Sequence, residues 1–339
     1  MKNIFIAAML LITIYSCKKQ TEDTSVKNNI QEELSAPVPP TNYWTFKLNV
    51  PVAFGVRSGM ANFVISNKAY IFGGYDWDGS GQKKDLWEYD PIANTFTQKA
   101  SLPASAPARI APAAFSINGK GYIATGYGGP VLKDLWEYDP VANSWNQKAD
   151  MPGLGRWKAV GFAINGKGYI ATGNDFGTTL KDIWEYNPVS NSWTQKANMP
   201  TASGREEAFV FVFNNKAYVG GGYQPTNKTM YEFDPSQGTN GLWLQKANYP
   251  GQGSLGIAAF ATNLAGYAGT GAILNGGFTF YKDFWRYSPS TNTWTSKQAF
   301  LGTTRAWAMG FSINGIGYMG LGRDENDNTN NRDLYRYVQ

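Results

Sequence analysis

Aromatic and polar side chains alternate in a short segment that recurs six times along the chain. In Asp134–Pro140 the order is Asp-Leu-Trp-Glu-Tyr-Asp-Pro, so the rings occupy alternate positions ahead of the proline. The other copies lie at 85–91, 182–188, 229–235, 283–289 and 333–337. This alternation predicts a half-buried β-strand, and the proline that ends five of the six copies predicts a turn because proline cannot donate to a ladder.

Each aromatic segment is the third of four expected strands. Two strands precede it, joined in three repeats by Asn-Gly pairs at 118–119, 165–166 and 314–315, which predict type I′ hairpins because both turn residues need positive φ. The second strand of every repeat carries an aligned tyrosine, and these are Tyr70, Tyr122, Tyr169, Tyr218, Tyr267 and Tyr318. The fourth strand carries one large ring, and these are Phe96, Trp145, Trp193, Trp243 and Trp294.

The first residues of successive aromatic segments are 47 to 54 positions apart. This period, the glycines after the second strand, the third-strand tyrosine and the fourth-strand tryptophan together resemble the Kelch repeat. The resemblance covers 43–339 and implies an all-β fold, a six-bladed Kelch-type propeller. The last repeat ends without a fourth strand, whereas the segment around Trp44 looks like a fourth strand with nothing before it. We therefore expect this N-terminal strand to complete the last blade.

The first 42 residues have a different character. Residues 1–16 combine a basic start with a short apolar run, as in a signal peptide. Ile14–Cys17 resembles a bacterial lipobox, which implies lipidation of Cys17 and a membrane anchor, and Lys18 implies an outer-membrane lipoprotein facing the periplasm or the cell surface. Residues 17–42 are polar and end in a proline-rich stretch, so we expect a disordered tether.

Composition narrows the chemistry. The chain has one cysteine and no histidine, so thiolate or imidazole metal sites and Ser-His-Asp catalysis are excluded from the domain, and we expect no metal and no cofactor. The net charge is only +5 and no basic cluster stands out, which argues against nucleic-acid binding. A closed ring needs no partner to cover its core, so we expect a monomer.

Arginine recurs 13 residues before the aligned tyrosine in five of the six repeats. These residues are Arg57, Arg109, Arg156, Arg205 and Arg305, and the fifth repeat has Ser254 instead. In Kelch propellers the matching arginines lie at one mouth of the axial channel, and the resemblance implies a site for an acidic ligand there. The alternative is structural, with each arginine bonded to loop carbonyls of the neighbouring blade.

Residues that differ between repeats are further ligand-binding candidates. Beside the arginines and in the loops after the second strands lie Trp157, Trp307, Trp77, Phe176 and Tyr223. Aromatic faces next to carboxylates and amides suit a sugar. Glu206 and Glu207 are candidates for a general acid or base, and only one of two adjacent strand residues can face the channel.

These observations favour a non-catalytic module that binds a glycan or protein ligand at the mouth of the channel. The alternative is an enzyme similar to the sialic-acid mutarotases, which are also exported Kelch propellers, with Glu206 or Glu207 moving a proton during opening of a sugar-acid ring. Galactose oxidase shares the fold, but its copper site needs histidines that this chain lacks, so we reject that activity.

Overall fold

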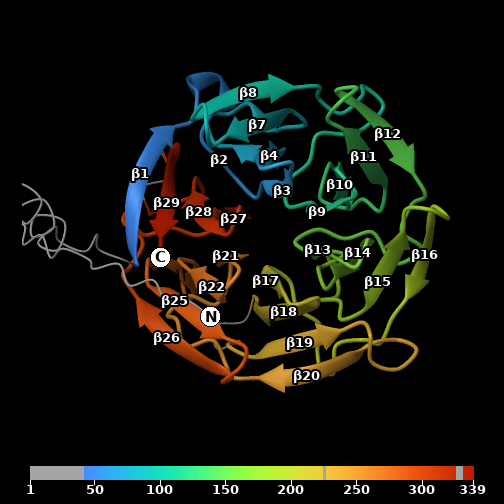
Figure 1. The fold of residues 1–339 in the computed structure, drawn as a ribbon. Coiled ribbons are helices and arrows are strands. Elements are labelled where there is room, and N and C mark those ends of the chain that lie inside the picture. The colour runs from blue at the N-terminus through green and yellow to red at the C-terminus, as the bar shows by residue number, and fades with distance from the viewer. Residues whose placement is uncertain (1–41, 224–226, 326–330) are drawn as a thin grey trace, which may run out of the picture. The chain divides into compact units, whose positions relative to one another are not determined.

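Six four-stranded antiparallel sheets account for most of the computed structural model, which describes residues 42–223, 227–325 and 331–339. The predicted signal peptide, Cys17 and nearly all of the predicted tether lie outside the described residues. In Figure 1 the sheets surround one axis, and the strand that precedes the aligned-tyrosine strand is innermost in each sheet. The described residues fall within one unit, Thr41–Gln339.

The six sheets follow one another along the chain. The first blade is β3 (Ala61–Ile65), β4 (Lys68–Phe72), β7 (Leu86–Asp90) and β8 (Thr95–Lys99). The second is β9 (Ala113–Ile117), β10 (Lys120–Ala124), β11 (Leu135–Asp139) and β12 (Ser144–Lys148). The third is β13 (Val160–Ile164), β14 (Lys167–Ala171), β15 (Ile183–Asn187) and β16 (Ser192–Gln195).

The remaining three blades repeat this order with longer loops. The fourth is β17 (Ala208–Phe213), β18 (Lys216–Gly221), β19 (Met230–Asp234) and β20 (Leu242–Lys246). The fifth is β21 (Ala258–Ala261), β22 (Gly266–Gly269), β25 (Phe284–Ser288) and β26 (Thr293–Lys297). The sixth is β27 (Met309–Ile313), β28 (Ile316–Gly320), β29 (Asp333–Val338) and, from the other end of the domain, β1 (Tyr43–Asn49).

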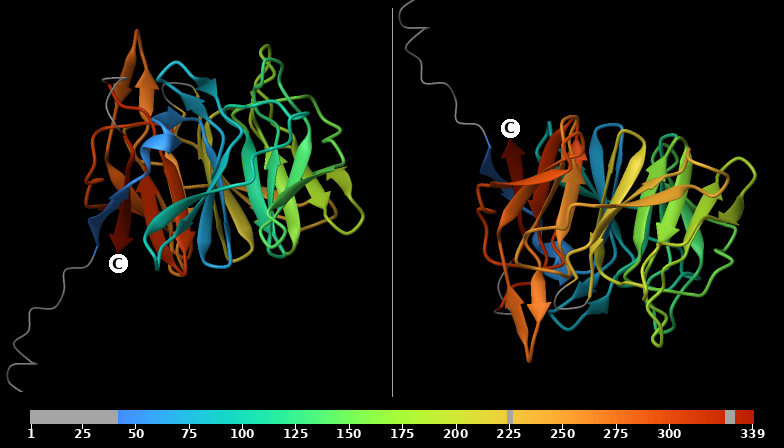
Figure 2. Two further views of the ribbon diagram at one scale, coloured as in Figure 1. Left: turned by 90° about the horizontal axis from the view of Figure 1, so that it is seen from above. Right: turned by 90° about the horizontal axis from the view of Figure 1, so that it is seen from below.

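The loops at one end of the blades contain additional short strands. A small sheet is formed by β2 (Arg57–Ser58), β5 (Tyr75–Asp76) and β6 (Gly81–Gln82), and β23 (Ala272–Leu274) pairs with β24 (Phe278–Phe280). Both project from the same face of the ring in the side views of Figure 2. The only helical element among the described residues is the 3-10 turn η1 (Val52–Phe54). None of the described residues forms a helix that is long and apolar enough to cross a membrane.

The N-terminal strand closes the last blade as predicted. β1 pairs antiparallel with β29, and Trp44 lies opposite Tyr337 just as Trp145 lies opposite Tyr138 in the second blade. Trp44 Nε1 donates to the Gln298 carbonyl of the preceding blade at 3.3 Å. The fourth-strand tryptophans of the second to fifth blades make the same bond to their preceding blades. The prediction of a six-bladed ring sealed by Trp44 is confirmed.

Tyrosines hold neighbouring blades together. The aligned tyrosine of each second strand packs on a third-strand ring of the next blade, with centroids 5.4 to 5.8 Å apart in all six pairs. The pair between Tyr318 and Tyr89 joins the last blade to the first. The burial of large rings at every blade boundary contributes strongly to the stability of the fold. The apolar core is therefore divided among the six boundaries between blades.

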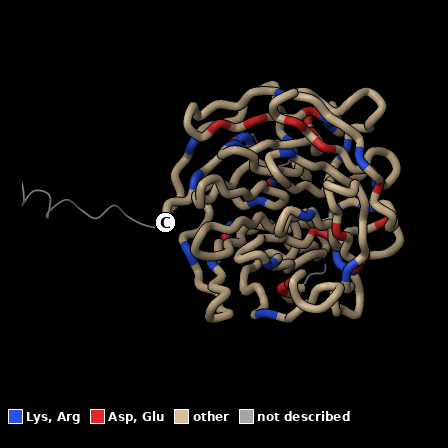
Figure 3. The backbone as a smooth tube through the Cα atoms, turned by 45° about the vertical axis from the view of Figure 1, so that its right-hand side comes forward, with Lys and Arg blue, Asp and Glu red and all other residues tan. Residues whose placement is uncertain are grey.

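The predicted hairpin turns are also present. Asn118 and Gly119 have φ of 50° and 75°, and the pairs at 165–166 and 314–315 have similar values. Charged positions of both signs are spread over the ring in Figure 3, and no segment is dominated by one sign. Many of these side chains pair across strands, as Lys120 does with Asp139 at 2.6 Å.

Candidate functional site

The arginines predicted for the channel mouth are buried inside the blades instead. All five are 2% exposed or less. In the third blade, Arg156 Nη1 and Nη2 donate to the two carboxylate oxygens of Asp182 at 2.6 and 2.8 Å. Nη1 also donates to the Thr172 carbonyl of the same blade at 3.0 Å. The other bidentate pairs are Arg57 with Asp85, Arg109 with Asp134, and Arg305 with Asp333.

For these four arginines the ligand prediction is wrong. A bidentate carboxylate already accepts the in-plane N–H bonds of the guanidinium edge that an acidic ligand would need. The structural alternative holds, although the partners lie within each arginine's own blade and not in the neighbouring one. Arg205 is the exception, since Thr229 stands where the other blades have aspartate and accepts a hydrogen bond from Nη2 at 3.0 Å.

The rim of the channel is built from six residues with the same left-handed backbone conformation. They follow each arginine position by two residues and are Gly59, Ala111, Lys158, Glu207, Gly256 and Trp307, with φ between 51° and 63°. Their backbones connect neighbouring blades: Lys158 N donates to the Ala111 carbonyl and Glu207 N to the Lys158 carbonyl, both at 3.0 Å. All six line one cavity of about 150 Å³.

This conformation has a cost for four of the six. A residue with a Cβ in the left-handed region loses about 1–2 kcal/mol relative to its preferred backbone, whereas glycine does not. The bonds between blades hold the backbone there. As a result, the side chains of Lys158, Glu207 and Trp307 are presented to the cavity at the mouth.

Three of the predicted aromatic residues meet at this mouth. Trp77, Trp157 and Trp307, from the first, third and sixth blades, line a cavity of about 190 Å³ together with Phe278 of β24. Phe278 packs edge-on against Trp307 at 5.2 Å. The cavity shares its lining residues Lys158, Glu207 and Trp307 with the rim, so it opens onto the axial channel.

An ion pair lies in the wall of this cavity. Lys158 Nζ is 2.6 Å from Glu207 Oε1 and 3.5 Å from Glu206 Oε2, and it lies 4.3 Å from the ring centre of Trp157. Burial lowers the pKa of Lys158, but the two carboxylates outweigh it and leave the pKa raised. Burial raises the pKa of Glu206 against the opposing effect of Lys158.

Two buried polar atoms of this wall have no hydrogen-bond partner among the described residues. They are Glu207 Oε2, an acceptor, and Trp157 Nε1, a donor. Buried polar groups are nearly always bonded, so each of them indicates a place for a ligand or water. Of the two glutamates only Glu207 lines the cavity, so one of the pair faces the channel as expected. The reason differs from the expected one, because both residues precede β17 and the left-handed backbone at Glu207 directs its side chain inward.

Arg323 is a cavity residue that the sequence analysis missed. Its guanidinium carbon lies 4.7 Å from the ring centre of Trp77, 5.5 Å from that of Phe278 and 6.0 Å from that of Trp307. These cation–π contacts stiffen the aromatic wall. The sequence did contain a signal for it. At the position five residues after the aligned tyrosine the first five repeats carry Tyr, Tyr, Asn, Tyr and Ala, and only the sixth carries a charged residue, Arg323.

Two other predicted residues do not line the cavity. Phe176 is 59% exposed and packs against Trp157 and Tyr127, at 5.4 and 5.1 Å, so it extends the aromatic surface at the rim. Tyr223 is 37% exposed, and its amide donates to the Glu206 carbonyl. The described residues contain no group of three or more histidine, cysteine, aspartate or glutamate side chains that could hold a metal ion.

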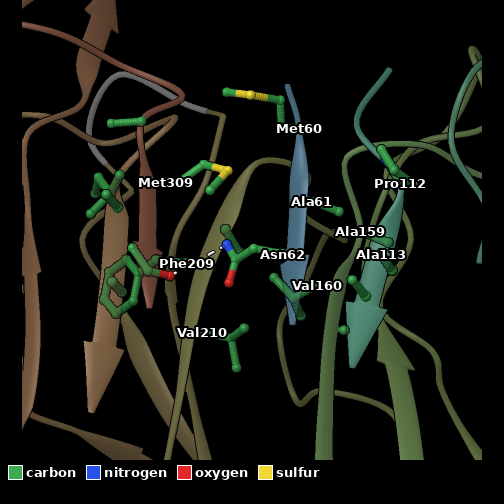
Figure 4. Close-up of a pocket in the computed structure, with 18 residues that line it drawn as sticks. Met60, Ala61, Asn62, Pro112, Ala113, Ala159, Val160, Phe209, Val210 and Met309 are labelled. Atoms are coloured by element: carbon green, nitrogen blue, oxygen red, sulfur yellow. Dashed lines mark hydrogen bonds between the residues drawn. The ribbon is translucent and has the colours of Figure 1, made fainter. Parts of the chain in front are cut away.

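Below the rim most residues that line the channel have apolar side chains. Its cavity of about 260 Å³ is lined by the start of all six innermost strands, with Met60, Ala113, Val160, Phe209 and Met309 among the residues labelled in Figure 4. Asn62 is a polar exception, and its Nδ2 donates to the Gly310 carbonyl at 3.4 Å, the bond drawn in Figure 4. The chemical variety is therefore at the mouth.

Six four-stranded sheets around an axis, with the repeated ring and arginine positions described above, define a class of fold, a β-propeller of the Kelch type. The family model of the Kelch motif matches residues 57–103 and 162–200. A solved structure titled "Structure of YjhT" is similar in fold, with a TM-score of 0.69 and 18% sequence identity over 84% of this chain and 94% of that one. No curated protein matches the sequence.

Proposed function

We propose that the propeller binds a carbohydrate in the tryptophan-lined cavity at the mouth of its channel. The observation that carries the proposal is the meeting of Trp77, Trp157 and Trp307 from three blades around one cavity. Flat aromatic faces accept the C–H patches of a sugar ring, and Tyr or Trp rings carry much of the energy in such sites.

The polar atoms of the cavity support the same ligand. Trp157 Nε1 offers a donor and Glu207 Oε2 an acceptor that no described residue satisfies, and Lys158 adds a cation beside them. A sugar hydroxyl can both donate and accept, so it suits this mixture. The cavity has a volume of about 190 Å³, below the range of about 300–1,000 Å³ that is usual for drug-sized ligands. This small volume favours a single sugar residue over a segment of a protein ligand.

The test is a glycan array with the full chain, followed by calorimetric titration of the best ligand. Trp157→Ala and Trp307→Ala should each weaken binding by about tenfold or more, as expected for a central aromatic anchor. Phe46→Ala is the matched control, because Phe46 is an exposed ring on β1 at the outer edge of a blade. Binding that survives both tryptophan changes would contradict the proposed site.

Glu207 favours one alternative, proton transfer on a bound sugar acid as in the sialic-acid mutarotases. Its Oε2 is buried, unpartnered and next to an apolar wall, which is the setting of many general acids and bases. Exchange between the anomers of sialic acid, followed by NMR, tests this function. Glu207→Gln should abolish catalysed exchange and leave binding largely intact, whereas a purely binding protein would not accelerate the exchange at all.

A further inference from the structure

The fourth blade departs from the ion-pair pattern of the others. At the first position of the aromatic segment it has Thr229, where the other five repeats have aspartate. Two residues later it has Tyr231, where the first, second, third and fifth blades have a tryptophan whose indole N–H donates to that aspartate. The arginine of this blade, Arg205, is nevertheless retained.

Arg205 is a buried cation without a carboxylate. It is 2% exposed, and no acidic side chain among the described residues forms an ion pair with it. Nη1 donates to the carbonyls of Gly221 and Thr229 at 3.1 Å each, and Nη2 to the Thr229 hydroxyl at 3.0 Å. Burial lowers the pKa of Arg205 to about 10. The ring of Tyr231, with its centre 5.5 Å from the guanidinium carbon, offsets part of the cost of burying this charge, and an anion would offset more.

The fifth blade has the opposite loss. There the aspartate, Asp283, is retained and the arginine is replaced by Ser254. Asp283 Oδ2 still accepts hydrogen bonds from Gln252 N at 3.0 Å and Trp285 Nε1 at 2.6 Å. Tyr249 is fully buried in this blade. A Cβ added to Gly251 would lie 2.2 Å from its hydroxyl, and one added to the equivalent Gly153 of the third blade would lie 3.0 Å from Arg156 Nη2. The Tyr249 hydroxyl therefore lies near the place that the guanidinium takes in the third blade, although this hydroxyl and Asp283 Oδ1 have no hydrogen-bond partner among the described residues.

In the fourth blade a cavity is found at the corresponding place. About 390 Å³ of open space is lined by the loop 200–205 and by Asn227, Thr229 and Tyr231. Arg205 Nε and the hydroxyl of Thr201 in this wall are buried and have no hydrogen-bond partner among the described residues. Ala202 and Ser203 of the same loop are exposed, so the cavity has access to solvent.

We propose that this cavity binds a carboxylate ligand, whose oxygens pair with the Nε and Nη2 edge of the Arg205 guanidinium and supply the negative charge that the third-strand aspartate supplies in the other blades. Arg205 supplies the planar guanidinium, and the Thr201 hydroxyl supplies a further donor. The Thr229 hydroxyl already donates to Asn227 Oδ1 at 2.9 Å and holds Arg205 Nη2 in place. The carboxylate belongs either to a small organic acid or to an aspartate side chain of a partner segment. This site involves none of the residues of the tryptophan-lined cavity.

The experiment compares the melting temperature of the full chain with rising acetate against sodium chloride at equal ionic strength. A capped tetrapeptide with a central aspartate forms the second arm. Near saturation a ligand specific to the folded state should raise Tm by about 2–4 °C. Shifts by acetate and the peptide indicate an open carboxylate site, and a shift by the peptide alone indicates a partner segment.

Two variants make the test specific. Thr229→Asp restores the bond set of the other blades, so its Tm without ligand should be higher than that of the natural chain and should no longer respond to acetate or peptide. Arg205→Ser, which copies the fifth blade, should also lose the response. No shift in the natural chain, the same shift in both variants, or an equal shift with sulfate in place of the carboxylates would overturn the proposal.

Discussion

Replacing Asp182 with alanine tests whether the arginine pairs are structural. The change leaves the guanidinium of Arg156 buried without its bidentate partner and removes the acceptor of the Trp184 indole N–H at 2.7 Å. Removing one partner of a buried ion pair costs about 3–5 kcal/mol. The Asp182 side chain is 19% exposed, so water can partly replace it, and we expect about 3 kcal/mol, near the lower limit of that range.

This loss converts into a modest change in melting temperature. A ring of about 300 residues has an unfolding entropy of about 0.6 kcal/mol/K, so the variant should melt about 5 °C lower. Differential scanning calorimetry of the full chain measures this. Lys120→Ala removes the partly exposed pair with Asp139 and serves as the control, for which we expect little change.

The double variant Arg156→Ala/Asp182→Ala separates the pair from its surroundings. If the two side chains act together, the double variant should lose clearly less stability than the sum of the single variants. Equal melting temperatures for Asp182→Ala and Lys120→Ala would refute the reasoning, because they would show that the buried guanidinium needs no counter-charge.

Two more predictions concern closure and pH. Trp44→Ala should lower the free energy of unfolding by about 3–5 kcal/mol, because Trp44 is buried against Phe284, Phe300 and Tyr337 at the seam of the ring. Urea denaturation should show a lower midpoint for this variant. A midpoint equal to that of Phe46→Ala would show that other contacts hold the seam. Burial raises the pKa of Glu232, but its bonds with Tyr218 and two lysines outweigh this and lower the pKa below its usual value. The stabilisation by Glu232 is therefore present above about pH 4.3 and is lost as pH falls through the lower pKa of the folded state. In Glu232→Gln the fall of Tm with decreasing pH should be less steep. An unchanged fall of Tm would exclude this contribution.

Most of the fold could be predicted because its determinants recur. The aligned tyrosines, the Asn-Gly turns and the aromatic segments each appear in several copies, so an accidental match in one repeat is corrected by the others. The unmatched strand around Trp44 and the missing last strand were complementary, and only a ring lets them meet. Repetition of this kind reports on architecture.

The role of the arginines could not be predicted in the same way. The sequence shows that each arginine comes before the innermost strand. The direction of its side chain depends on the geometry of a loop, and the sequence does not reveal that geometry. The clue that was available is correlation within the chain. Arginine and third-strand aspartate occur together in four repeats, and the fourth and fifth repeats each lack one of the two. This pattern indicates a pair.

The rim shows where repetition and function separate. All six blades use the same left-handed residue to bond to their neighbours, and Gly59 and Gly256 meet that requirement without strain. Lys158, Glu207 and Trp307 meet it at a cost, and these three side chains line the cavity at the mouth. Ala111 bears the same cost with only a methyl group, so the strain alone does not identify a site. At the other three positions the strained backbone presents an ion pair and a tryptophan to the cavity, which are the groups that the proposed function requires.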